Sequence, residues 1–227
     1  MISVIIPTYN EAACIEGLIY YLIKNASNPI EVIVSDAGST DNTLEIAKHA
    51  GAIAILSPYK GRAAQMNYGT TIATGNIYYF VHADSFPPKS FVEDIEAVVN
   101  NGYDAGRYQT KFISKSLLLK FNAFFTRFNL FVCYGGDQTL FVNSSLFNKL
   151  NGFNETKSIM EDYDITQRIQ KAGQYKIFSK PALVSARKYE TNSWLAVQRA
   201  NYIAIKMYKN GMDSAAIARS YKEMLRP

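Results

Sequence analysis

The sequence predicts an α/β fold with a mostly parallel central sheet. Over the first hundred residues, short runs rich in β-branched side chains alternate with helix-like segments. Those runs show no alternation of polar side chains, which is typical of parallel strands covered on both faces. The chain has 227 residues, 48% hydrophobic and 19% charged, a size and composition suited to one compact soluble domain. We therefore expect a single domain over residues 1–227.

The first half contains four expected strands and four expected helices. The strand-like runs are ISVIIP, IEVIVSD, AIAIL and IYYFVHAD, at residues 2–7, 30–36, 52–56 and 77–84. Helical patterns follow at residues 11–24, 42–49, 62–73 and 88–99, the second behind Ser39, Thr40 and Asp41 as plausible caps. Open sheets of this kind bind ligands at the carboxyl ends of their strands.

After residue 100 the pattern becomes less regular. We expect strands at 105–112 and 138–142, a helix at 115–131, short helices up to 171, a strand-like ALV at 182–184 and a helical tail from Trp194. No repeat or linker-like stretch interrupts the chain, so the sequence gives no reason to divide it into two domains.

Charge is distributed unevenly along the chain. Residues 1–100 carry a net charge of about −5 and residues 101–227 about +10. A basic half can face phosphates, an anionic membrane or nucleic acid, but no nucleic-acid-binding motif accompanies it, so we expect no nucleic-acid partner.

Cys14 and Cys133 lack metal-ligand spacing and are interpreted as reduced thiols. Pro7 breaks the first apolar run, which argues against a signal peptide or membrane span and for a cytoplasmic protein.

Polar residues collect where three of the expected strands end, in PTYNE, SDAGSTDNT and HADS. Taken singly, Asp36 would be a turn residue and Asp84 the cap of the helix after Pro87. Taken together, they suit a nucleotide site, which needs an aromatic face, a polar group for the base or ribose, and a carboxylate near a phosphate-bound metal. Tyr9, Asp36 and Asp84 supply these groups in order.

These stretches resemble the family 2 glycosyltransferases, which have the GT-A fold. The resemblance rests on SVIIPTYNE, VIVSDAGSTDNT, GRAAQMNYG, FVHADS and MEDYD, in the family's order over most of residues 1–170. The set is most similar to a small bacterial branch, the radical-SAM/selenodomain-associated transferases. The resemblance implies a Rossmann-like GT-A domain with a nucleotide-binding half (1–100) and an acceptor half with a helical C-terminal tail (101–227).

The resemblance also implies a site for a UDP- or GDP-linked sugar. Asp36 matches the aspartate that reads the base, and Arg62 matches the basic residue of the third helix. Asp84 matches the metal-proximal aspartate, and it would hold Mg²⁺ or Mn²⁺ through one bond while phosphates and waters complete the shell. The residues assigned to the nucleotide-sugar are Pro7, Thr8, Tyr9, Glu11, Asp36, Gly38, Arg62, His82 and Asp84.

His82 departs from the family pattern, because it stands where the metal-binding motif has its first acid. A neutral imidazole can make the same kind of ribose contact, or the ring can simply be satisfied by backbone. The substitution removes a negative charge beside the expected metal, so the sequence leaves open whether the metal is strictly required.

Sugar transfer needs a base for the acceptor hydroxyl and positive charge for the departing diphosphate. By spacing alone, the acids of MEDYD would only favour a helix N-terminus. The resemblance implies that Asp162 is the base and that transfer is a single, inverting displacement. It places Glu161 on the acceptor side, together with Asp137 and Gln138 of YGGDQTLF, although a plain tight turn would have the same sequence. Arg187 could meet the diphosphate, but a solvated basic edge is the favoured interpretation.

Residues 105–136 contain no Asp or Glu, five Lys or Arg and six Phe. An apolar stripe that includes Phe121, Phe124 and Phe128 recurs there at helical spacing, and such a stripe usually belongs to a core. A basic, Phe-rich helix without acids is also typical of a helix lying on a membrane. The second possibility is a contact of residues 115–131 with an anionic membrane, at its inner face, which would suit a lipid-linked acceptor.

We therefore expect an inverting glycosyltransferase that moves a sugar from a nucleotide-diphospho-sugar to a hydroxyl acceptor, either lipid-linked or a saccharide. The alternative is a non-catalytic nucleotide-sugar-binding or scaffolding protein, which would keep Tyr9 and Asp36 but show no turnover. A dinucleotide-dependent oxidoreductase or an NTPase is disfavoured, because the sequence lacks G-x-G-x-x-G after the first strand and G-x-x-x-x-G-K-[ST] anywhere.

Overall fold

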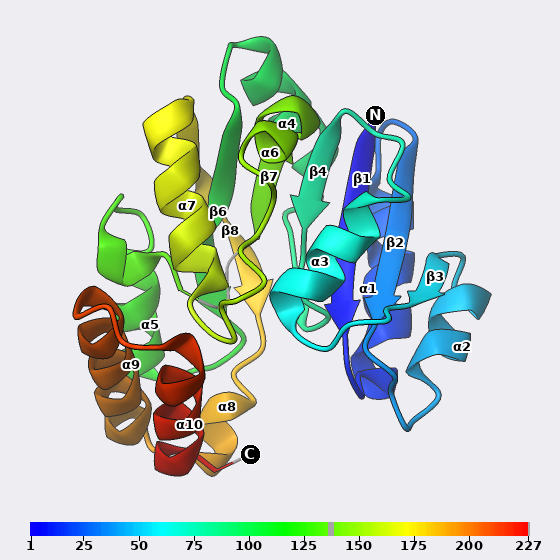
Figure 1. The fold of residues 1–227 in the computed structure, drawn as a ribbon. Helices are drawn as coiled ribbons and strands as arrows, with labels where there is room; N and C mark the ends of the chain where they lie inside the picture. The colour runs from blue at the N-terminus through cyan, green and yellow to red at the C-terminus, as the bar shows by residue number, and fades with distance from the viewer. Residues whose placement is uncertain (136–138, 227) are drawn as a thin grey trace.

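The computed structural model describes residues 1–135 and 139–226, and its centre is one eight-stranded sheet (Figure 1). The strands are β1 (Ile2–Thr8), β2 (Ile30–Asp36), β3 (Ile53–Leu56), β4 (Ile77–Phe80), β5 (Ser85–Phe86), β6 (Ala105–Phe112), β7 (Leu140–Asn143) and β8 (Tyr175–Val184). They lie in the order β3-β2-β1-β4-β7-β6-β8-β5, and four of the seven described pairings are parallel. The predicted α/β class with a mostly parallel sheet is confirmed.

Helices pack on both faces of this sheet. The helices are α1 (Ala12–Asn25), α2 (Thr43–His49), α3 (Arg62–Thr70), α4 (Phe91–Asn100), α5 (Leu117–Phe125), α6 (Ser144–Lys149), α7 (Glu161–Ala172), α8 (Lys188–Thr191), α9 (Trp194–Lys209) and α10 (Ser214–Met224). Of these, α8, α9 and α10 lie beyond one end of the sheet (Figure 1). A short 3₁₀ helix spans Phe131–Cys133. Among the described residues, no helix meets the length and apolarity required for a membrane span.

The core explains why the strands carry continuous apolar runs. Ile2, Val4 and Ile6 of β1 join one buried cluster with α1, α2 and α4. Ile5 of β1 joins a second buried cluster with α3, α6 and α7 on the opposite face. Both faces of β1 are therefore buried, as period-2 side-chain geometry and two helical layers require. Gly69 of α3 lets that helix approach closely, since a Cβ there would lie 2.6 Å from Ile5.

Parallel pairing brings the strand ends together. Thr8 at the end of β1 is paired with Asp36 at the end of β2, and Ile5 is paired with Phe80 at the end of β4. The predicted strand over 77–84 is too long, because β4 ends at Phe80 and the chain then turns, with Ser85 N–H donating to His82 O. After this turn β5 pairs antiparallel with β8, which places Ser85 opposite Val184.

The predicted helix over 115–131 is also too long, because α5 ends at Phe125. The buried Arg107 side chain of β6 donates to Thr126 O and Phe128 O at 2.7 and 3.2 Å, and Thr110 N–H donates to Thr126 Oγ1. These bonds tie the chain to β6 immediately after Phe125. Continued helix would use the same backbone groups, so the helix stops there.

Candidate active site

Two loops at the carboxyl ends of β1 and β2 hold one another in place. Asn10 N–H donates to Ser39 Oγ, and Asn10 Oδ1 accepts from Thr40 N–H, both at 2.8 Å. Beneath them, the buried Gln65 amide of α3 donates to Thr8 O and Ser35 O at 2.7 and 2.8 Å. Asn10 has a positive φ of 57°, so the turn into Glu11 depends on this network.

Asp36 organises the second loop. Its two carboxylate oxygens accept four hydrogen bonds, from Thr8 Oγ1, from Gly38 N–H, and from both the N–H and the hydroxyl of Ser39. The side chain is buried, and Gly38 allows the loop a φ of 82°. Base reading by Asp36 stays a prediction, because the carboxylate is already used by the protein's own loop.

Seven of the nine residues assigned to the nucleotide-sugar line one polar cavity of about 360 Å³ at this edge of the sheet. They are Pro7, Thr8, Tyr9, Glu11, Arg62, His82 and Asp84, whereas Asp36 and Gly38 do not line it. Arg187, Lys188 and Ser185 line the same cavity. We call it the polar cavity.

Arg187 bridges the two carboxylates of the polar cavity. Its guanidinium donates to both oxygens of Glu11 at 2.7 and 2.6 Å, and its Nε lies 3.2 Å from Asp84 Oδ2. These hydrogen bonds raise the pKa of Arg187, so the side chain stays charged. The favoured expectation of a solvated basic edge was wrong, although half of the Arg187 side chain remains accessible.

His82 lies in the wall of the polar cavity as a neutral ring. Burial, together with the positive charges of Arg62 and Arg187, lowers the pKa of its imidazole to about 3. At neutral pH the ring therefore keeps one donor and one acceptor nitrogen. A ribose contact by His82 is chemically available.

The acids at the start of α7 lie beside the polar cavity. Glu161 is buried and its Oε1 lies 3.4 Å from Arg62 Nε, while Asp162 is partly buried. Met160, immediately before them, has a left-handed φ of 70°. A bulky residue in that region costs about 1–3 kcal/mol, and such strain clusters at functional sites. The strained turn fixes the direction from which Glu161 and Asp162 enter.

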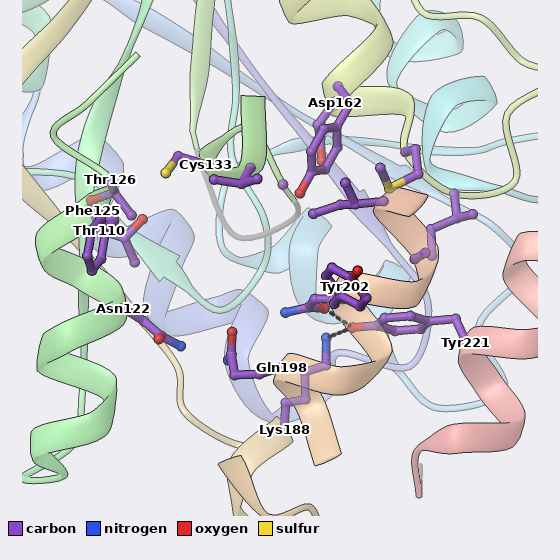
Figure 2. Close-up of a pocket in the computed structure, with 18 of the residues that line it drawn as sticks. Thr110, Asn122, Phe125, Thr126, Cys133, Asp162, Lys188, Gln198, Tyr202 and Tyr221 are labelled. Carbon is purple, nitrogen blue, oxygen red and sulfur yellow. Dashed lines mark hydrogen bonds between the residues drawn. The ribbon is translucent and has the colours of Figure 1, made fainter. Parts of the chain in front are cut away.

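A second cavity, of about 540 Å³, lies between α5, α9, α10 and the start of α7 (Figure 2). Glu161 and Asp162 line it, and Arg62, Lys188 and Tyr189 line both cavities. We call it the apolar cavity, since much of its wall is aromatic or aliphatic. Of the residues predicted on the acceptor side, Glu161 is at this cavity, whereas Asp137 and Gln138 lie outside the described residues.

The residues of the polar cavity fit one divalent cation held through a single protein carboxylate. No group of three or more His, Cys, Asp or Glu side chains suited to a metal occurs within residues 1–135 and 139–226. Asp84 is a partly exposed carboxylate beside a neutral imidazole and three cationic residues, Arg62, Arg187 and Lys188. Mg²⁺ is often held by one or two carboxylates, with substrate phosphates and waters as further ligands.

Comparison with known proteins decides the family. The model of the glycosyl transferase family 2 matches residues 3–144. The chain is a family 2 glycosyltransferase. Enzymes of this family transfer a sugar from a nucleotide-sugar, and the matched residues include Tyr9, Arg62 and Asp84 of the polar cavity.

Several known proteins resemble this transferase. It is 26% identical over 196 residues to a PGL/p-HBAD biosynthesis glycosyltransferase of Mycobacterium bovis, covering 82% of the chain and 72% of that protein. Its fold matches residues 1–349 of TarS of S. aureus in complex with UDP-GlcNAc, with a TM-score of 0.67, 19% identity, and coverage of 98% of the chain and 71% of that TarS chain. It also matches the mannosyltransferase PcManGT of Pyrobaculum calidifontis in complex with GDP-Man and Mn²⁺, with a TM-score of 0.65, 18% identity, and coverage of 98% and 69%. The GT-A fold is therefore confirmed.

Proposed function

We propose that this transferase moves a sugar from a UDP- or GDP-linked donor to a hydroxyl acceptor in a single, inverting displacement. The observation that carries the proposal is the joining of the two cavities at Arg62, Lys188 and Tyr189. Residues 1–100 supply most of the donor side and residues 101–227 the acceptor side of one domain. Within the family, the motif order still favours the radical-SAM/selenodomain-associated branch.

In this proposal Asp162 accepts the proton of the acceptor hydroxyl as its oxygen bonds to the anomeric carbon. The bond from that carbon to the phosphate oxygen breaks on the opposite face, and its electron pair leaves with the diphosphate. Arg62 and Arg187 offset the charge that develops on the leaving group. Glu161 holds Arg62 through their ion pair, so it acts as a positioning residue.

We assign Asp84 as the protein ligand of Mg²⁺ or Mn²⁺. When bound, the cation supplies further positive charge to the diphosphate. Arg187 forms an ion pair with Asp84, so binding of donor and cation requires Arg187 to share or release that carboxylate. The Mn²⁺ complex of the mannosyltransferase with the same fold supports this assignment.

UDP or GDP should stabilise the protein, and more so with Mn²⁺. At about 100 times its Kd, a ligand of the native state adds about 2.7 kcal/mol, which in a chain of this size raises the melting temperature by roughly 5–10 °C. Thermal-shift scans with each diphosphate, with Mn²⁺ and with EDTA, check this. Uridine and guanosine, which lack the diphosphate, serve as controls. No shift with either diphosphate would contradict the proposed donor site.

The phenylalanine stripe around α5 is largely exposed, so the structure does not support the core interpretation. Leu119 is the buried side chain of α5, while Leu117, Phe121, Phe124 and Phe128 are 76%, 57%, 46% and 41% exposed. Lys115, Lys120 and Arg127 accompany them. We propose that this α5 surface, residues 115–131, contacts an anionic membrane. Because Cys14 and Cys133 are thiols, we propose the cytoplasmic side, where thiols stay reduced.

Replacing Phe124 and Phe128 together by Ser should abolish most membrane binding and leave folding intact. The wild type should float with vesicles containing anionic lipid, and less so as salt rises, because charge interactions are screened over about 10 Å at 0.1 M. Flotation and melting curves measure the two effects. Leu56→Ser, which removes an exposed leucine from β3, should leave flotation unchanged. A wild type that never floats, or a double variant that melts much earlier, would refute the membrane contact.

A further inference from the structure

The apolar cavity has walls that suit a molecule with a substantial apolar part. Aromatic side chains come from α5 and α9, and further apolar side chains come from the 3₁₀ helix and the turn before α7. The principal apolar lining residues are Phe121, Phe125, Val132, Met160, Trp194 and Ile205. Its volume of about 540 Å³ lies within the range of small-molecule sites, roughly 300–1,000 Å³.

A few polar groups are set into these walls, and one of them lacks a partner. Gln198 Nε2 is buried and donates to no hydrogen-bond acceptor within the described part of the chain. A buried amide donor without a partner costs about 1–3 kcal/mol, and a ligand oxygen would recover this once the Gln198 amide turns toward the cavity. Figure 2 shows Gln198 of α9 and Asn122 of α5 pointing into the cavity from opposite sides. The Asn122 side chain is oriented by Trp194 Nε1–H, which donates to Asn122 Oδ1 at 3.3 Å.

The two ends of the cavity differ in chemistry. Asp162 lies at one end and Lys188 at the other (Figure 2), while Arg62 and Lys188 each line the polar cavity as well. At the other end Lys188 donates to Tyr221 Oη, which in turn donates to Asn201 Oδ1 at 2.9 Å. The mouth carries exposed apolar side chains, Phe121, Val132 and Tyr202. A hydroxyl held near Asp162 can therefore be carried by a group whose apolar part lies against these side chains.

We infer that the apolar cavity is the acceptor site and that the acceptor is an amphiphile, a hydroxyl-bearing head on an aryl or alkyl group, rather than a free saccharide. This inference rests on the proposed function, because it places the acceptor beside the proposed base. Apolar walls exclude water and gain free energy from the apolar group. Gln198 and Asn122 offer hydrogen bonds to its polar head.

The single tryptophan of the chain reports on this site, because Trp194 lies in its wall. Methyl, phenyl and octyl β-D-glucoside share one polar head and differ in the attached group, and octyl glucoside is used below its micelle concentration. We expect phenyl or octyl glucoside, or both, to change Trp194 fluorescence saturably and to bind at least about tenfold more tightly than methyl glucoside. Comparing the affinities of phenyl and octyl glucoside distinguishes an aromatic from an aliphatic acceptor.

Phe121→Ala should weaken that binding by about five- to tenfold, since it removes part of an aromatic wall. Leu117→Ala is the matched control, because Leu117 is on the same helix, is more exposed and does not line the cavity. Melting curves of both variants identify any loss of folding. Equal binding of the three glucosides, no binding of the phenyl and octyl compounds, or equal effects of the two variants would overturn the inference.

The proposed function is tested separately in the same preparation, by the melting shift with UDP or GDP. If a diphosphate binds and the amphiphiles do not, the acceptor inference fails while the proposed donor site stands. If the amphiphiles bind and neither diphosphate does, the proposed function fails instead.

Discussion

Asp162→Asn should reduce sugar transfer by about 10²–10⁴-fold and leave donor binding unchanged. The amide keeps the shape of the side chain but cannot accept the proton of the acceptor hydroxyl. Asp162 lines the apolar cavity and is absent from the lining of the polar cavity, so the diphosphate should bind as before. Transfer is measured as diphosphate released from the donor chosen by the melting scans, with the best acceptor analogue, and donor binding by calorimetry.

The start of α7 offers a matched control. Asp164 is on the same turn, but its carboxylate pairs with Arg168 at 2.6 Å and does not line either cavity. Asp164→Asn should therefore retain most activity. Wild-type turnover by Asp162→Asn would move the base elsewhere. Donor binding by the wild type without turnover, across varied acceptors, would favour the non-catalytic alternative.

Local sequence patterns were sufficient for the first half of the fold. The apolar runs of β1, β2 and β3 and the helices between them have their expected positions, because two-sided burial and parallel order leave a clear local signal. The same order predicted that Thr8 and Asp84 would meet at one edge, and both line the polar cavity. That part of the site follows from the parallel direction of the strands, which brings their carboxyl ends to one edge of the sheet.

Arg187 could not be placed in the same way. It reaches Asp84 and Glu11 because β5 pairs antiparallel with β8, which brings Val184 opposite Ser85. β5 has only two residues, and Ser85 and Val184 are 99 positions apart in the chain, so no local periodicity indicates the pairing. The only available signal was the basic pair after ALV.

The role of α5 also depended on distant residues. Its helical stripe is compatible with a core or a surface, and the choice is made by which elements pack against it. Arg107 of β6 donates hydrogen bonds to the backbone immediately after α5 and so ends the helix. On the other side of the apolar cavity, α9 contributes Trp194 and Gln198. The tail from Trp194 was expected to be helical, but nothing in its sequence indicates that it closes one side of a cavity beside Asp162.

Asp84→Ala should remove the effect of Mn²⁺ on diphosphate binding. In the wild type we expect UDP or GDP to bind more tightly with Mn²⁺ than with EDTA. In the variant the two affinities should be equal, a loss of at least about tenfold in the Mn²⁺ condition, on the scale seen when groups around a metal are changed. Calorimetry of the diphosphate in both buffers measures this.

The ion pair between Asp84 and Arg187 also predicts how Asp84→Ala binds the diphosphate in EDTA, without metal. Without Asp84, the polar cavity loses one negative charge, and Arg187 keeps its ion pair with Glu11. In EDTA the variant should therefore bind the diphosphate at least as tightly as the wild type.

Asp41→Ala is the control. Asp41 belongs to the adjacent loop, where its carboxylate accepts hydrogen bonds from Ala12 N–H and Thr43 N–H, and it does not line the polar cavity. Its Mn²⁺ dependence should be that of the wild type. If Asp84→Ala retains that dependence too, Asp84 is not the metal ligand, and Arg62 and Arg187 remain the groups that offset the charge of the diphosphate.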